Sequence, residues 1–255
     1  MKEEEALRRM MSGLEGRISA VAWRPKTGER FAYRAEEPQI AASVIKIPIM
    51  IEAFRQREAG TLDFDGETTV KEEDKMPSCG ALTYMHTGLR VTTRDLVTLM
   101  IILSDNTATN LLIDRLGMDN VNATMEALGM SAGTRLRRKL FDAERARQGI
   151  QNTVTAADMA ALLGRMLEGT LISPEASEEM LRMMGDQRLN GKMPFYLHSR
   201  GIDCAHKTGE DDGITHDVGI IGTEPETIFC FLSSETDVPA AERAIQDAAA
   251  LLAGI

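Results

Sequence analysis

The residues whose types and spacing could do chemistry fall in three short motifs: Ser43–Lys46, Ser104–Asn106 and Lys207–Gly209. Ser43 and Lys46 stand three residues apart, so on a helix they share one face. A serine hydroxyl is a poor nucleophile until a base takes its proton, and a lysine whose pKa is lowered by burial can be that base. The first motif therefore predicts nucleophilic catalysis by Ser43. A serine cap followed by one partly buried lysine is the alternative, because the pattern is short and unselective.

The segment Ser43–Glu58 predicts the helix that would carry this pair. Its apolar residues form the stripe of a buried helix, and Pro48 falls near the first turn, where proline is best tolerated. Ser43 would then lie at the helix N-terminus, where unpaired backbone N–H groups favour developing negative charge.

The second motif follows a helix that must run through a core, because Leu96–Leu103 is almost wholly apolar. A second helix is expected over Ala108–Leu116, after residues suited to capping. Residues two apart do not share a helix face, so Ser104 and Asn106 can reach one cleft only if the motif connects the two helices. Asp105 would then turn inward to hold the connection. An ordinary capped helix–helix turn remains the alternative.

The third motif is expected on a strand that starts near Ile202 and leads into an acidic turn at residues 210–213. Lys207 supplies positive charge and Thr208 a hydroxyl donor, together suited to a substrate carboxylate. Gly209 removes a side chain where a substrate could lie along the strand edge. A strand lysine followed by a turn glycine is the alternative explanation.

The three motifs, S-x-x-K, S-D-N and K-T-G, resemble in type and order the set found in class A β-lactamases and penicillin-binding proteins. The resemblance covers nearly the whole chain. It implies the β-lactamase-like α/β (α+β) fold, an antiparallel sheet flanked by N- and C-terminal helices plus an all-helical part. It also implies a serine hydrolase that forms an acyl-enzyme and needs no cofactor.

The resemblance implies a role for each motif residue. Ser43 would be the nucleophile, Lys46 its base, and Ser104 the relay that passes the proton to the leaving nitrogen beside Lys207. The backbone N–H groups of Ser43 and Glu210 would form the oxyanion hole. The substrate-binding residues would be Asn106, Lys207, Thr208, Gly209 and Glu210, with Asn106 holding the substrate's amide side chain and Thr208 its carboxylate.

One segment departs from the family. Hydrolytic members carry an acidic residue, before a T-T-x-P helix start, that activates water to clear the acyl-enzyme. Residues 134–136 and 153–156 match the two ends of that loop, but residues 137–152 lack the expected R-W-E-P-x-L-N pattern. Asp142 and Glu144 are the candidate carboxylates, and Glu144 completes the predicted catalytic set, although both could equally be exposed loop charges. Without a positioned base, deacylation would slow by about two to four powers of ten.

Three functions therefore stay open at this stage. The first is a β-lactamase that hydrolyses the β-lactam amide. The second is a D-alanyl-D-alanine carboxypeptidase-like peptidase or a carboxylesterase, favoured by the altered loop. The third is a β-lactam-binding module without turnover.

Length and composition favour one domain spanning residues 1–255, because 255 residues with 43% hydrophobic content can bury a sizeable core. Its α/β part would comprise residues 1–38 and 202–255, and its helical part residues 39–201. Strands at both ends must meet in one antiparallel sheet. The expected helices outside the motifs are 3–14, 119–128, 156–168, 174–184 and 239–253, and the expected first hairpin joins 18–23 to 29–34.

Charge and composition limit the partners. The formal net charge of −10 disfavours nucleic acid and anionic membranes, so the expected partner is a small-molecule or peptide substrate with a carboxylate, bound by a monomer or dimer. The four histidines show no metal-ligand spacing, so no metal site is expected. His206 and His216 flank the third motif and could reach the cleft, although structural roles are at least as favoured.

Three cysteines, an odd set without a motif, suit reduced thiols. The charged N-terminus has no apolar signal core, and no run has the length of a membrane span. As written, the chain is expected to be cytoplasmic, unless a signal segment has been trimmed from it.

Overall fold

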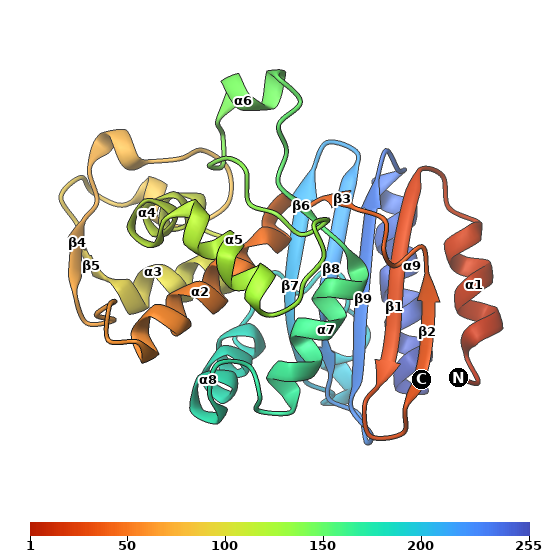
Figure 1. The fold of residues 1–255 in the computed structure, drawn as a ribbon. Coiled ribbons are helices and arrows are strands. Elements are labelled where there is room, and N and C mark those ends of the chain that lie inside the picture. Colours follow the sequence, from red (N-terminus) through yellow and green to blue (C-terminus); the bar gives the residue numbers. More distant parts are fainter.

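The computed structural model describes residues 1–255. Its central feature is a five-stranded antiparallel sheet (Figure 1). The strand order is β2-β1-β9-β8-β7, so strands from the two ends of the chain lie side by side, with Ala22 opposite Phe229. The strands are β1 (Arg17–Arg24), β2 (Glu29–Tyr33), β7 (Cys204–Asp211), β8 (Ile214–Ile221) and β9 (Thr227–Ser234). The expectation that strands from both ends meet in one sheet is confirmed, and β7, which carries the third motif, is an edge strand.

One face of the sheet is covered by the two terminal helices, α1 (Glu4–Ser12) and α9 (Val238–Ala253), which contact each other (Figure 1). Alternate strand residues face them, since successive side chains of a strand point to opposite sides. The buried cluster on this face includes Leu7, Phe31, Phe229, Phe231 and Ile245. On the other face, α7 (Ala156–Leu167) packs against β1, β8 and β9.

The helical part lies beside the sheet and shares a larger apolar cluster with it. The remaining helices are the 3₁₀ turn η1 (Ala42–Ile45), α2 (Lys46–Glu58), α3 (Thr93–Ile102), α4 (Asn106–Leu116), α5 (Met118–Ala127), α6 (Ala143–Arg147) and α8 (Pro174–Gly185). Three further single 3₁₀ turns are η2 (Glu72–Asp74), η3 (Leu82–Tyr84) and η4 (His198–Arg200). Two short ribbons join β3 (Gln39–Ile40) to β6 (Thr153–Val154) and β4 (Glu67–Thr69) to β5 (Arg90–Thr92). No helix is both long enough and apolar enough to cross a bilayer.

The predicted elements are present, with two differences near the motifs. The helix expected from Ser43 begins as a 3₁₀ turn and becomes α-helical at Lys46. The acidic turn expected at residues 210–213 is shorter, because Glu210 and Asp211 still pair with β8. The reversal falls on Asp212 and Gly213, and Gly213 has φ +66°, a conformation glycine adopts without strain.

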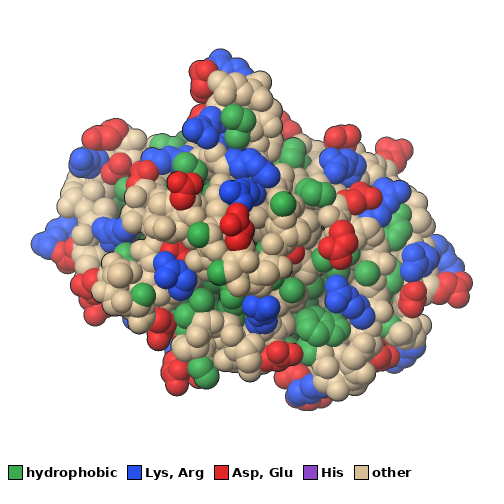
Figure 2. All heavy atoms as spheres, in the orientation of Figure 1, with side chains coloured by type: hydrophobic (Ala, Val, Ile, Leu, Met, Phe, Trp, Pro, Cys, Tyr) green, Lys and Arg blue, Asp and Glu red, His purple; other side chains and the backbone are tan.

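The surface seen in Figure 2 carries basic and acidic side chains interspersed rather than gathered by sign. In the same orientation α6 projects from the body of the molecule (Figures 1 and 2). The loop that contains α6 is the segment whose sequence departs from the family pattern.

Candidate active site

The 3₁₀ turn η1 sets the first pair of the site. A 3₁₀ helix has three residues per turn, so residues three apart are eclipsed. Lys46 Nζ accordingly lies 2.9 Å from Ser43 Oγ. Val44 and Ile45, between them, are fully buried and anchor the turn to the core. The predicted contact between Ser43 and Lys46 is therefore present in the structure.

Lys46 makes four polar contacts within the site. Its side chain is fully buried, and Nζ also lies 2.7 Å from the Ser104 carbonyl, 2.9 Å from Ser104 Oγ and 2.9 Å from Asn106 Oδ1. Burial, and then the nearby charge of Lys207, hold the pKa of Lys46 well below its ordinary value. A lowered pKa favours the neutral amine that a base requires.

The hydrogen-bond inventory agrees with a neutral amine. The Ser104 carbonyl and Asn106 Oδ1 can only accept, so they take both N–H bonds of a neutral lysine. The one lone pair of a neutral amine can then accept from either Ser43 or Ser104, whose hydroxyl oxygens both lie 2.9 Å from Nζ. A lone pair 2.9 Å from a serine hydroxyl is in reach of its proton.

The second motif connects α3 to α4, as expected. Ser104 has φ +54°, and Asp105 caps α4 by accepting from the Ala108 N–H at 2.9 Å. The same carboxylate accepts from the N–H groups of Ala81 and Leu82, at 2.7 and 2.8 Å. The inward turn of Asp105 is confirmed, and it leaves Ser104 and Asn106 facing Lys46.

Lys207 of β7 approaches from the opposite side. Its fully buried Nζ lies 3.1 Å from Ser104 Oγ and 2.8 Å from the Thr208 carbonyl. Burial lowers the pKa of Lys207 to about 7. Ser104 Oγ thus stands between two lysine nitrogens and can pass a proton along this path.

The structure shows a reason for glycine at position 209 that differs from the one expected from the sequence. A Cβ on Gly209 would lie 3.0 Å from His216 Cδ2 and 3.2 Å from Val44 Cγ2. Contacts this short require a neighbour to move. The absence of a side chain at Gly209 therefore lets η1 pack closely on β7. The position that a Cβ would take is bordered by Val44 and His216 and does not open into a cleft.

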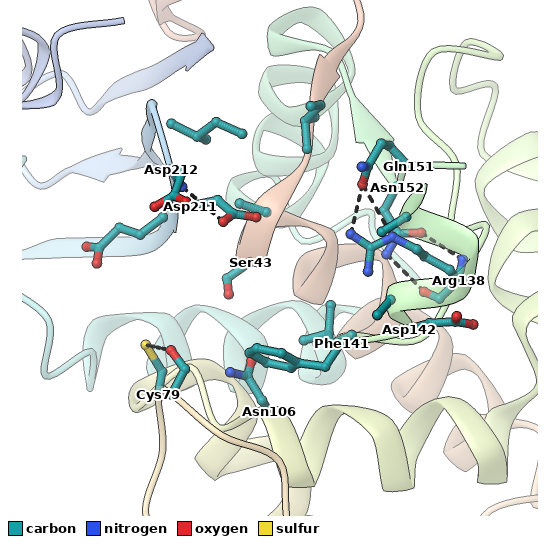
Figure 3. Close-up of a pocket in the computed structure, with 18 of the residues that line it drawn as sticks. Ser43, Cys79, Asn106, Arg138, Phe141, Asp142, Gln151, Asn152, Asp211 and Asp212 are labelled. Carbon is teal, nitrogen blue, oxygen red and sulfur yellow. Dashed lines mark hydrogen bonds between the residues drawn. The ribbon is translucent and has the colours of Figure 1, made fainter. Parts of the chain in front are cut away.

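A cavity of about 640 Å³ opens over this cluster (Figure 3). Of the predicted site residues, Ser43, Asn106 and Glu210 line it, whereas Lys46, Lys207 and Thr208 lie beneath its wall. Asp211 and Asp212 stand at one end, and Phe141, Asp142 and Arg138 belong to the loop at the other.

The two candidate carboxylates of the loop at residues 137–152 occupy different environments. Asp142 lines the cavity but caps α6, accepting from the Arg145 N–H at 3.0 Å. The Glu144 side chain is 73% exposed, outside the cavity lining, and contacts Arg147 and Gln148. The structure does not bring Glu144 to Ser43, because the residue sits on the solvent side of the projecting helix. Its predicted place in the catalytic set is therefore corrected.

The two histidines are structural. His206 is buried, with its ring nitrogens 2.8 Å from Asp217 Oδ1 and 3.0 Å from Asn190 Oδ1. His216 Nε2 donates to the Ile40 carbonyl and Nδ1 accepts from the Ser233 N–H. Burial lowers the pKa of His216 to about 4, so its ring is neutral at neutral pH.

Sequence reasoning missed three residues at the site. Cys79 and Leu140 line the cavity, and Lys192 is buried beside Gly209 and Glu210. None of them belongs to a motif of adequate specificity. Their places follow from long-range packing, which local spacing does not report.

Comparisons with known proteins show the family and the fold. The profile of the beta-lactamase enzyme family matches residues 2–254. A β-lactamase from Sphaerobacter thermophilus is 32% identical, with a TM-score of 0.89 over 100% of this chain and 98% of that one. An ancestral class A β-lactamase is 25% identical, with a TM-score of 0.88 and 98% of each chain covered. PBP-A, at 23% identity, shares the fold, with a TM-score of 0.89 over 100% of this chain and 95% of its own. With its motifs gathered around one cavity and the family profile spanning it almost end to end, the chain belongs to the beta-lactamase enzyme family.

Proposed function

We propose that the protein is a serine β-lactamase-type hydrolase that opens the β-lactam amide through an acyl-enzyme on Ser43. The observation that carries the proposal is the 2.9 Å contact between Ser43 Oγ and Lys46 Nζ, whose pKa burial holds well below its ordinary value. Family membership, shown by the profile match, supports the same reaction class.

In acylation, Lys46 takes the proton as Ser43 Oγ attacks the lactam carbonyl. The new C–O bond forms, and the lactam C–N bond then breaks. Ser104, in contact with both Lys46 and Lys207, delivers a proton to the leaving nitrogen. Backbone N–H groups of Ser43 and Glu210 stabilise the oxyanion, each worth about 3 kcal/mol.

In this proposal the substrate is held by polar groups of the second and third motifs. Asn106, on the cavity wall, binds the amide side chain, and Thr208 binds the carboxylate, which Lys207 attracts electrostatically. The Thr208 carbonyl accepts from Lys207 Nζ at 2.8 Å, so the two residues proposed to receive the carboxylate are in direct contact. A carboxylate-bearing substrate fits this set.

Deacylation is the weak step in this proposal. The cavity-lining loop offers Leu140 and Phe141, while its one carboxylate at the cavity, Asp142, is engaged as a helix cap. A water molecule beside the acyl carbonyl would lack a positioned base. This observation favours a second candidate function, a penicillin-binding protein-like peptidase or esterase. In such an enzyme β-lactams acylate the serine, and the acyl-enzyme is then hydrolysed slowly.

The two functions separate in one set of measurements. Steady-state turnover of a chromogenic cephalosporin, beyond a stoichiometric burst, supports the β-lactamase. A burst without turnover, together with hydrolysis of a short-chain p-nitrophenyl ester or a D-alanyl-D-alanine peptide, supports the second candidate. A failure of all three substrates to acylate Ser43 contradicts the proposal as a whole.

A further inference from the structure

Lys192 is a buried lysine that the acylation chemistry described above does not use. It lies in the segment between α8 and β7, and its side chain is only 4% exposed. Its Nζ lies 2.9 Å from Glu210 Oε1 and 3.4 Å from the carbonyls of Gly209 and His216, with Glu242 Oε1 at 3.8 Å. These contacts surround the end of the third motif.

One of these contacts is with the peptide group that joins Gly209 to Glu210. The carbonyl of Gly209 and the N–H of Glu210 belong to the same trans peptide, so they point in opposite directions. Gly209 pairs with His216 of the neighbouring strand, so its carbonyl faces β8, and Lys192 Nζ is a further partner 3.4 Å from both the Gly209 and the His216 carbonyls. The Glu210 N–H therefore faces the free edge of the sheet, where the cavity that contains Ser43 lies.

We infer that Lys192 is a positioning residue that fixes and polarises the Gly209–Glu210 peptide, so that the Glu210 N–H is aimed at the developing oxyanion. The inference rests on the proposed function, because it needs acylation at Ser43. A positive charge on the carbonyl side of an amide strengthens the N–H donor on its other side. The 2.9 Å contact with the Glu210 carboxylate holds the same residue from its side chain.

Burial explains why Lys192 has these partners. A buried ammonium group is costly unless it is paired and hydrogen-bonded. Glu210 and Glu242 supply the opposite charges, and the two carbonyls take further N–H bonds. The two carboxylates also occupy the ammonium group, so a substrate carboxylate would have to displace them to reach it.

The test compares Lys192→Met with the parent on two substrates, a neutral p-nitrophenyl ester and a carboxylate-bearing β-lactam. Single-turnover kinetics separate the acylation rate constant from the saturation constant. If one oxyanion donor is misoriented in the variant, acylation should slow by about tenfold to a hundredfold for both substrates, and the saturation constants should stay nearly unchanged. Lys192→Arg, which keeps charge and donors, should restore most of the rate, and Lys2→Met is the matched exposed control.

Two results overturn the inference. If Lys192→Met weakens saturation by the β-lactam alone and leaves the ester unaffected, Lys192 binds the substrate carboxylate instead. If both substrates acylate the variant at the parent's rate, Lys192 has no part in the reaction. If Lys192→Met fails to fold, Glu210→Ala is the second variant, because it removes the carboxylate that contacts Lys192. Acylation of both substrates should slow in Glu210→Ala, although by less than in Lys192→Met. An unchanged acylation rate would reject the inference. A parent that neither substrate acylates contradicts the proposed function, which is a different outcome.

Discussion

Asn110 holds the backbone of Leu140 at both of its polar groups. The Leu140 N–H donates to Asn110 Oδ1 at 2.9 Å, and Asn110 Nδ2 donates to the Leu140 carbonyl at 3.0 Å. Leu140 also lines the cavity that contains Ser43. A residue with a firmly held backbone thus offers an apolar side chain at the point where the loop meets the site.

We predict that Leu140→Glu speeds deacylation, because a carboxylate held at this position could activate water beside the acyl group. A positioned general base contributes about two to four powers of ten, so even an imperfect one should raise steady-state turnover at least about tenfold. Stopped-flow measurement of the burst and steady state with a chromogenic cephalosporin checks this. An unchanged steady state with acyl-enzyme still accumulating would show that Leu140 is misplaced for water activation.

Glu144→Gln should leave both acylation and turnover unchanged. Its side chain is 73% exposed and points away from the cavity, so removing its charge alters nothing near Ser43. The burst amplitude and steady-state rate of this variant should match those of the parent. A slower steady state would return Glu144 to the catalytic set and would mean that α6 moves when substrate binds.

Gly209→Ala should destabilise the fold and slow acylation together. The added methyl group would press on Val44 and His216, and overpacking a buried contact costs about 1–3 kcal/mol. The relaxation would displace η1 and therefore Ser43. Chemical denaturation with acylation kinetics measures both effects, and Gly185→Ala, where an added Cβ meets no atom within 4 Å, is the control. A Gly209→Ala protein of parental stability would contradict the packing argument.

The pH dependence of acylation should reflect the titration of Lys207. Burial lowers its pKa to about 7, so Lys207 is charged below that pH and neutral above it. Its charge attracts the substrate carboxylate, so kcat/KM for a carboxylate-bearing β-lactam should fall above about pH 7, approaching about tenfold per pH unit. Burial lowers the pKa of Lys46 well below its ordinary value, which favours the unprotonated amine that acts as base. A profile that rises or stays flat to about pH 9 would remove Lys207 from carboxylate binding.

The fold was largely predictable because its signals are local. Apolar periodicity placed the helices, and turn residues between 25 and 28 placed the first hairpin. The order of the three motifs predicted that Ser43, Lys46 and Ser104 would converge, and their contacts agree. The spacing of Ser43 and Lys46 fits either an α- or a 3₁₀-helix, so the form of η1 could not be read from it.

The rest of the site depends on packing between distant segments. The close approach of Val44 to Gly209, and the burial of Lys192 under Glu210, join residues far apart in the chain. Glu144 is a charge on a loop without a recognised pattern. Whether such a charge faces the cavity or solvent depends on how the loop is held, here by Asn152, which accepts from the N–H groups of Arg137 and Arg138.

The most direct test of the central claim is the intact mass of the protein after brief incubation with a penicillin. Ring opening keeps both products of the lactam attached, so the parent should gain the full mass of one β-lactam, located by peptide mapping at Ser43. Ser43→Ala should gain none, and Lys46→Ala should gain it far more slowly because the hydroxyl loses its base. If Ser43→Ala acquires the same mass at the parent's rate, Ser43 is not the nucleophile and the account is wrong.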